Sequence, residues 1–184
     1  MRRLFAALVL GGAALAQSEP PLPLGEDIYV PGTKVSVRLE RDNKTGRNVS
    51  SIFIDERYDT LGKTFVQFRC REDGRLAFFL RAKVPLLSEA DVVAGRPPPV
   101  GYRVDGQQPR TFAGVLTRKD GDFDRFTLAV SDAADTRFLQ AFRAARRAVE
   151  VRVARTGAPA LVLTFPVKGV REALQVVEGC GPLS

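Results

Sequence analysis

Apolar and polar side chains alternate over residues 63–82, which hold the most regular pattern in the chain. The apolar positions that share one face are Val66, Phe68, Cys70, Leu76, Phe78, Leu80 and Ala82. A period of two is typical of a β-strand with one buried face. Asp73-Gly74 separates the two halves, and glycine accepts the positive φ of a tight hairpin turn. The stretch predicts two strands joined by a turn, with one side in the core.

Similar alternation predicts strands on both sides of this hairpin. They cover residues 34–41 and 49–55 before it, and residues 100–105, 110–118, 125–131, 148–154 and 160–167 after it. Residues 84–99 break the pattern. Pro97, Pro98 and Pro99 favour a long loop there, because proline cannot donate the hydrogen bond that a central strand needs.

The spacing of apolar residues becomes helical after residue 131. Phe138, Leu139, Phe142 and Ala145 fall on one face and follow the N-cap candidate Ser131, so we predict a helix here. A second short amphipathic helix is predicted by Val170, Ala173, Leu174 and Val177, ending at Gly179-Cys180-Gly181-Pro182. Both helices belong to the C-terminal half.

Strands therefore dominate, and the predicted fold class is mainly β with two short helices. An antiparallel β-sandwich and a curved sheet covered by helices both satisfy the pattern, because either one buries one face of every strand. Residues 28–184 have the length of a single domain. A chain of this size buries about 70% of its unfolded surface and needs no metal to fold.

The N-terminus has the features of an export signal. Arg2 and Arg3 precede an apolar run, and Ala14-Leu15-Ala16 fits the small-residue cleavage site. We predict a signal peptide over residues 1–16 and a Pro-rich linker over residues 17–27, with a retained N-terminal anchor as the alternative. The expected location is the periplasm, the cell envelope or the extracellular space.

The chain has two cysteines, Cys70 and Cys180. Cysteines of exported proteins pair more often than they stay free, so we predict a structural disulfide between them. Closing a loop of this length contributes about 4–5 kcal/mol in the chain-entropy model. Redox-active cysteines more often lie close together, as in C-x-x-C, and these two do not.

The composition excludes several kinds of active site. The chain has no histidine, which excludes a conventional zinc site and removes the usual base of a nucleophilic triad. Asp120, Asp122 and Asp124 resemble the start of a calcium-binding loop, but the later ligands are missing and a polar hairpin turn is the simpler interpretation. We therefore predict no enzymatic activity and no cofactor. No small-molecule substrate is evident.

Basic residues outnumber acidic ones, giving a formal net charge of +7. Five arginines lie close in sequence: Arg143, Arg146, Arg147, Arg152 and Arg155. They predict a patch for an anionic partner, with a solvated helix and strand surface as the alternative. Nucleic acid is not favoured, because most phenylalanines fall on core faces and leave few aromatic rings to stack on bases. A membrane surface stays open as a partner.

Several segments share a layout that is known from exported bacterial proteins. They are the strand 65–70 ending in Cys70, the Gly-x-Leu-x-x-x-Leu pattern that starts at Gly74, Tyr-Arg-Val-Asp-Gly at residues 102–106, and Gly179-Cys180-Gly181. This layout resembles the TagO-like domains associated with type VI secretion. The resemblance covers residues 49–183, and the absence of tryptophan departs from it. It implies a disulfide-closed β-rich domain that binds other envelope proteins.

These observations predict an exported, non-enzymatic binding or accessory domain. Its expected partner is an envelope or extracellular protein. The alternative is an anionic-ligand binding protein that recognises phosphate, lipid or nucleic acid.

Overall fold

The computed structural model of the protein describes residues 23–177 and 180. The predicted signal peptide and the first part of the predicted linker (17–22) lie outside the described residues. The strands are β1 (Asp27–Tyr29), β2 (Val35–Arg38), β3 (Ser51–Asp55), β4 (Phe65–Cys70), β5 (Leu76–Arg81), β6 (Pro99–Val104), β7 (Arg110–Lys119), β8 (Asp122–Val130), β9 (Ala148–Val153) and β10 (Leu161–Pro166). The helices are α1 (Glu89–Ala94), α2 (Asp132–Ala144) and α3 (Val170–Val177).

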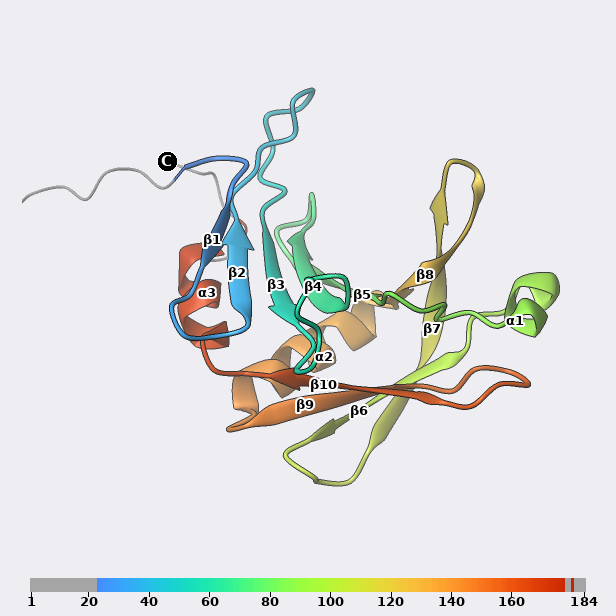
Figure 1. Ribbon diagram of the computed structural model, residues 1–184. Helices are drawn as coiled ribbons and strands as arrows, with labels where there is room; N and C mark the ends of the chain where they lie inside the picture. Colours follow the sequence, from blue (N-terminus) through green and yellow to red (C-terminus); the bar gives the residue numbers. More distant parts are fainter. Residues whose placement is uncertain (1–22, 178–179, 181–184) are drawn as a thin grey trace, which may run out of the picture.

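The mainly β fold is confirmed, and it takes the form of one curved sheet. All ten described strands are joined in the order β1-β2-β3-β4-β5-β8-β7-β6-β9-β10, and every pair of neighbours is antiparallel. The sheet bends so that β6, β9 and β10 cross below β3 and β4 (Figure 1). The curl brings the last strand, β10, back to the first half of the chain. There the Arg57 N–H donates to the Thr164 carbonyl of β10 at 2.8 Å.

One face of this sheet carries most of the fully buried apolar side chains. The register aligns an apolar row across β2, β3, β4, β5, β8 and β7 that consists of Val35, Ile54, Val66, Leu80, Leu128 and Leu116. In the other half of the sheet, alternate positions of β6 and β9 are buried as well, as in Val149, Val151 and Val153. Because the sheet curls, these faces meet in a single core.

Helix α2 packs against the inner face of the curved sheet. The Phe138 ring stacks on Phe78 of β5, with centroids 4.2 Å apart, and lies 4.8 Å from Tyr102 of β6. One turn later, Phe142 contacts Phe68 of β4 at 5.3 Å and Phe165 of β10 at 6.4 Å. Each ring therefore joins the two halves of the sheet. Helix α3 covers the neighbouring part of the core and contacts β2, β3 and α2.

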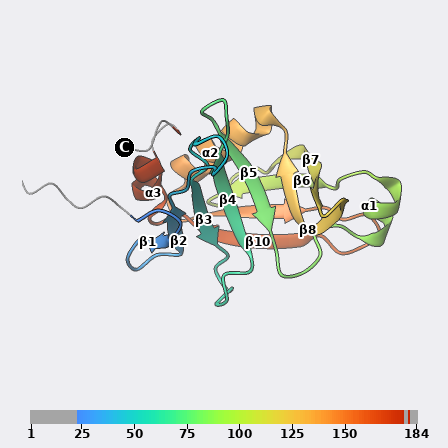
Figure 2. The same ribbon diagram turned by 90° about the horizontal axis from the view of Figure 1, so that it is seen from above.

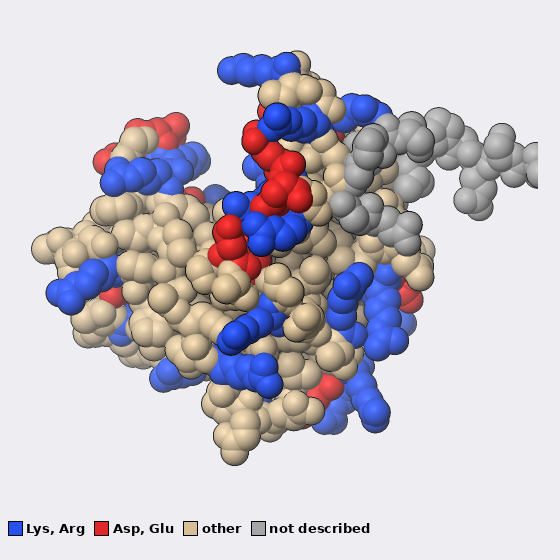
Figure 3. All heavy atoms as spheres, turned by 180° about the vertical axis from the view of Figure 1, so that it is seen from behind, with Lys and Arg blue, Asp and Glu red and all other residues tan. Residues whose placement is uncertain are grey.

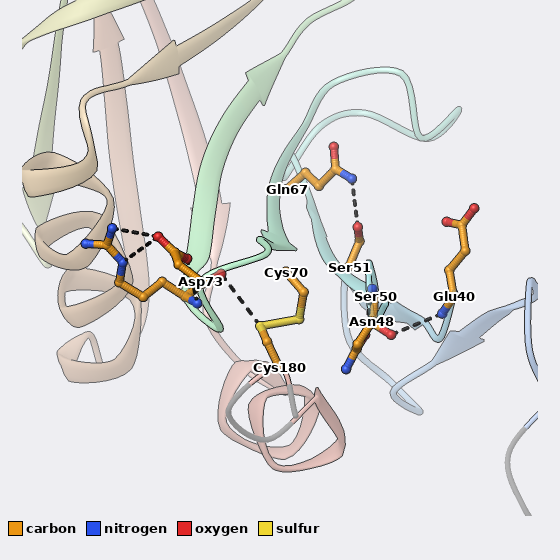
Figure 4. Close-up of a disulfide and its surroundings, with 9 residues drawn as sticks. Glu40, Asn48, Ser50, Ser51, Gln67, Cys70, Asp73 and Cys180 are labelled. Carbon is orange, nitrogen blue, oxygen red and sulfur yellow. Dashed lines mark hydrogen bonds and ion pairs between the residues drawn. A yellow bond between two sulfur atoms is a disulfide. The ribbon is translucent and has the colours of Figure 1, made fainter. Parts of the chain in front are cut away.

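The predicted disulfide is present. Cys70 ends β4, Cys180 follows α3, and their Cα atoms are 5.4 Å apart although 110 positions separate them in the chain. Figure 4 shows the bond between the end of α3 and the β4–β5 turn, where the Cys180 sulfur lies 3.7 Å from the Arg75 carbonyl oxygen. The bond fastens the C-terminal helix to the hairpin that the alternation predicted. The predicted helix stop at residues 179 and 181–182 lies outside the described residues.

Three local predictions were wrong or incomplete. The predicted loop 84–99 contains α1, which is capped by reciprocal hydrogen bonds between Ser88 and Asp91 and ends at Gly95 with φ 59°. Pro99 is the first residue of β6, a position where its missing N–H is tolerated. The end of the predicted linker joins the sheet, since the Gly25 N–H donates to the Leu39 carbonyl at 2.7 Å and β1 begins at Asp27.

Candidate functional site: a cationic groove beside α2

A groove of 780 Å³ separates α2 from the end of β6 and the β6–β7 loop. Its polar lining consists of Arg110, Arg137, Arg146, Arg147, Gln107, Gln108, Gln140 and Asp105, and its apolar lining of Tyr102, Val104, Ala141 and Ala144. Figure 3 shows the α2 side of the molecule, and basic groups predominate over its lower part, whereas acidic groups gather nearer the centre. We refer to this feature as the cationic groove.

A single carboxylate, that of Asp105, holds one wall of the groove in place. Asp105 and Gly106 have φ values of 46° and 83°, and the Gln107 N–H donates to the Val104 carbonyl at 2.8 Å, which closes a tight turn after β6. The Asp105 carboxylate accepts the backbone N–H groups of Arg146, Arg147 and Ala148 at 2.7, 2.9 and 3.0 Å. It thereby positions the chain where α2 leads into β9.

The same hydrogen bonds stabilise the charged form of this carboxylate. The N–H of Arg146, followed by that of Ala148, lowers the pKa of Asp105 below its ordinary value of 3.8, and the nearby charge of Arg147 acts in the same direction. The carboxylate therefore stays ionised at neutral pH. Its acceptor capacity is directed to the backbone, so it forms no side-chain hydrogen bond with the arginines of the groove.

Three guanidinium groups of the groove lack partners within the described part of the chain. Arg110, Arg146 and Arg147 form no side-chain hydrogen bond and no ion pair with a described residue. The fourth, Arg137, lies over the Phe112 ring at 5.6 Å from its centroid, an arrangement that leaves the edge of a guanidinium available. By contrast, Arg103 on the opposite face of β6 is paired with Glu150 at 2.6 Å. The groove therefore concentrates cationic donors that the described residues do not satisfy.

The arginines are distributed along the groove. Arg137 and Ala144 mark the ends of the α2 segment that lines it, and at about 1.5 Å per residue they are roughly 10 Å apart along the helix axis. Arg146 and Arg147 lie beyond that end, whereas Arg110 is opposite Tyr102 at the start of β7. A ligand that met all four arginines would be elongated.

The structure brings together two of the five arginines that the sequence predicted as a patch. Arg146 and Arg147 line the cationic groove. Arg143 lines a different hollow near Cys180, and Arg152 lines one on the outer side of β6 and β9. The Arg155 guanidinium donates to the carbonyls of Pro159 at 2.7 Å and Pro85 at 3.1 Å, which is a structural role.

Two arginines of the groove were not predicted. Arg137 stands on the same helical face as Gln140, Ala141 and Ala144, so the spacing in α2 could have indicated it. Nothing near Arg110 in the sequence connects it with α2, since the contact depends on the pairing of β6 with β7.

The aspartates that resembled a calcium loop shape the β7–β8 hairpin. Asp120 and Gly121 form its two-residue turn with φ values of 54° and 93°, and Lys119 pairs with Asp122. Asp124 accepts the Phe126 N–H at 2.9 Å and lies 3.7 Å from Arg81. Within residues 23–177 and 180, no group of three or more acidic or cysteine side chains is arranged to hold a metal ion.

A raised pKa marks one buried carboxylate, Asp135 in the first turn of α2. Burial raises this pKa, while a hydrogen bond from the Phe78 N–H at 2.8 Å and the charge of Arg71 oppose the shift. The carboxylate supplies an acceptor to β5 just beyond the last residue that pairs with β8, since that pairing begins at Phe79. Its position explains how α2 is attached to the sheet.

Comparisons with known proteins do not assign this chain to a family. No protein-family model, no curated protein and no solved structure matches it. None of the helices in the described part of the chain is long and apolar enough to cross a membrane. The case for function therefore depends on the chemistry of the groove.

Replacing Asp105 by asparagine tests the support of the groove. Asparagine tolerates the left-handed backbone but loses the charge that holds three N–H groups, so we expect the free energy of unfolding to fall by about 1–3 kcal/mol at neutral pH. Because the pKa of Asp105 is lowered in the folded protein, its contribution is present above the ordinary pKa and is lost as the pH falls through the lowered one. Urea unfolding at neutral and acidic pH measures this. Equal losses at both pH values would contradict the role of the charge.

Proposed function

We propose that this chain is an exported, non-enzymatic binding domain that holds an acidic segment of an envelope protein in the cationic groove. The observation that carries the proposal is the set of guanidinium groups without described partners, beside a single carboxylate that is directed to the backbone. Charge-assisted hydrogen bonds from arginine to carboxylate are among the strongest polar contacts in proteins. The disulfide is compatible with an exported location.

The shape and composition of the groove favour a peptide. An extended chain advances about 3.3 Å per residue, so the α2 segment of the groove spans about three residues. Gln107, Gln108 and Gln140 offer amides that donate and accept hydrogen bonds, as a peptide backbone requires. The role expected from the resemblance to TagO-like domains, binding of envelope proteins, agrees with this proposal.

Titration of the protein with a dye-labelled peptide of alternating glutamate and alanine, followed by fluorescence anisotropy, tests the proposal. We expect binding at low salt that weakens as salt is added, because part of the attraction is screened. The double variant R146Q/R147Q should weaken binding by about tenfold or more, since each guanidinium that is removed takes charge-assisted hydrogen bonds with it.

The matched control removes the same charge elsewhere. R69Q/R152Q replaces two exposed arginines that do not line the cationic groove, and it should retain most of the affinity. Equal weakening in both double variants would show that net charge alone attracts the peptide, and absence of binding at low salt would refute the proposal. If inorganic tripolyphosphate displaces the labelled peptide at lower concentrations than the unlabelled peptide does, the result favours a phosphate-bearing ligand instead.

A further inference from the structure

A loop on the side of the molecule opposite α2 presents large apolar side chains to solvent. It comprises residues 56–64 between β3 and β4, and in Figure 2 it projects away from the sheet. Tyr58 is 77% exposed and Leu61 70% exposed. The neighbouring segment after β5 adds Val84, which is 41% exposed, and the Lys83 N–H donates to Thr64 Oγ1 at 3.2 Å. We refer to Tyr58, Leu61 and Val84 as the apolar tip.

Hydrogen bonds hold this loop in a defined conformation. The buried Asp59 carboxylate accepts the N–H groups of Leu61 at 2.8 Å, Lys63 at 3.0 Å and Thr64 at 2.5 Å. The Glu56 carboxylate accepts the Tyr58 N–H at 2.7 Å. The exposed apolar side chains therefore belong to a preorganised loop, which loses little conformational entropy when it binds.

Lysines supply the exposed charges beside the apolar tip. Both carboxylates of the loop are buried and accept backbone N–H groups, whereas Lys63 and Lys83 are exposed and form no ion pair with any described residue. Arg57 is exposed as well, but it lines a hollow together with Asp105 and Glu150. The other carboxylate nearby, Asp55, is half-buried, and its pKa is raised by burial although the charge of Lys34 opposes the shift. The surface thus combines exposed apolar side chains with exposed lysines that are close in sequence to them.

We propose that the apolar tip inserts into the headgroup region of an anionic lipid bilayer. Tyrosine favours the membrane–water interface, where its ring lies among the headgroups and its hydroxyl meets water. Each lysine or arginine near an anionic surface adds attraction. A projecting tip suits this use, because a bilayer accepts apolar side chains without offering a matching cavity.

Sedimentation with vesicles tests this inference. The full chain should bind phosphatidylcholine vesicles that contain phosphatidylglycerol and should bind vesicles of phosphatidylcholine alone more weakly. The double variant Y58S/L61S should lower the partition coefficient by about tenfold or more, because two apolar side chains no longer leave water. K63Q should lower it by about fivefold on anionic vesicles. V93S, at a valine of α1 that is 88% exposed, should leave binding unchanged.

Tryptophan fluorescence provides a second readout, since the chain has no tryptophan. Y58W should show a blue shift when anionic vesicles are added, whereas V93W should keep its aqueous emission. Vesicle binding without a shift at position 58, or binding that Y58S/L61S leaves intact, would overturn insertion and point to another cationic surface. Absence of binding to anionic vesicles would also overturn it. Arg57 of the loop and Arg147 of the cationic groove line one small hollow, so the two surfaces are close to each other. R146Q/R147Q is therefore the control that separates membrane insertion by the loop from peptide binding in the groove.

Discussion

Replacing Phe138 by alanine is expected to lower the free energy of unfolding by about 3–5 kcal/mol. The ring is fully buried between Phe78 of β5 and Tyr102 of β6. These strands belong to opposite halves of the sheet, and among the described strands β8 and β7 lie between them. Removal of the ring leaves a cavity between two surfaces that cannot close without moving the sheet.

Urea unfolding followed by circular dichroism measures the effect as a lower midpoint at an unchanged slope. The control is T136A, an exposed position of the same helix, which should change stability by no more than about 0.5 kcal/mol. A loss no larger than that of the control would show that α2 does not hold the two halves of the sheet together.

Removing the disulfide should have an effect of similar size. The double variant C70A/C180A opens a loop that spans 110 positions, and we expect it to lose about 2–5 kcal/mol, chiefly because the unfolded chain becomes less constrained. Alanine is preferred to serine because Cys70 is buried in the core, where a hydroxyl would lack a partner.

Reduction of the native protein gives an independent measurement. The urea midpoint of the wild type should fall in the presence of dithiothreitol to that of C70A/C180A, while the midpoint of the variant should not respond. If reductant leaves the wild type unchanged and the variant is as stable as the wild type, the bond does not stabilise the position of α3 against the hairpin.

Local sequence patterns were enough for the elements that hold the core. The hairpin of β4 and β5 follows from its alternation and from Asp73-Gly74, and the buried positions of α2 and α3 follow from helical spacing. Helix α1 could have been found from Ser88, Asp91 and Gly95, but its short length and the prolines after it favoured a loop. The disulfide was predictable because only one pairing exists for two cysteines.

The candidate site was predictable only in part. Proximity in sequence suggested a patch, but Arg143, Arg152 and Arg155 lie on different surfaces. The reason is that they belong to different elements: the first to α2, the second to β9 and the third to the loop after β9. The apolar tip was not predicted at all. The loop that carries Tyr58 and Leu61 also contains Glu56 and Asp59, and only the hydrogen bonds of the folded loop show that both carboxylates are turned inward.

By itself, the sequence determined which side chains share a face of each strand or helix, because that depends on a backbone period of two or 3.6 residues. Only the tertiary structure decided that these faces curl into one sheet, and that Arg110 joins Arg137, Arg146 and Arg147 around a groove. The physical reason is that β5 pairs with β8 and β6 with β9 across long stretches of chain. Such pairing is selected by the packing of the whole inner face, and no local pattern records it.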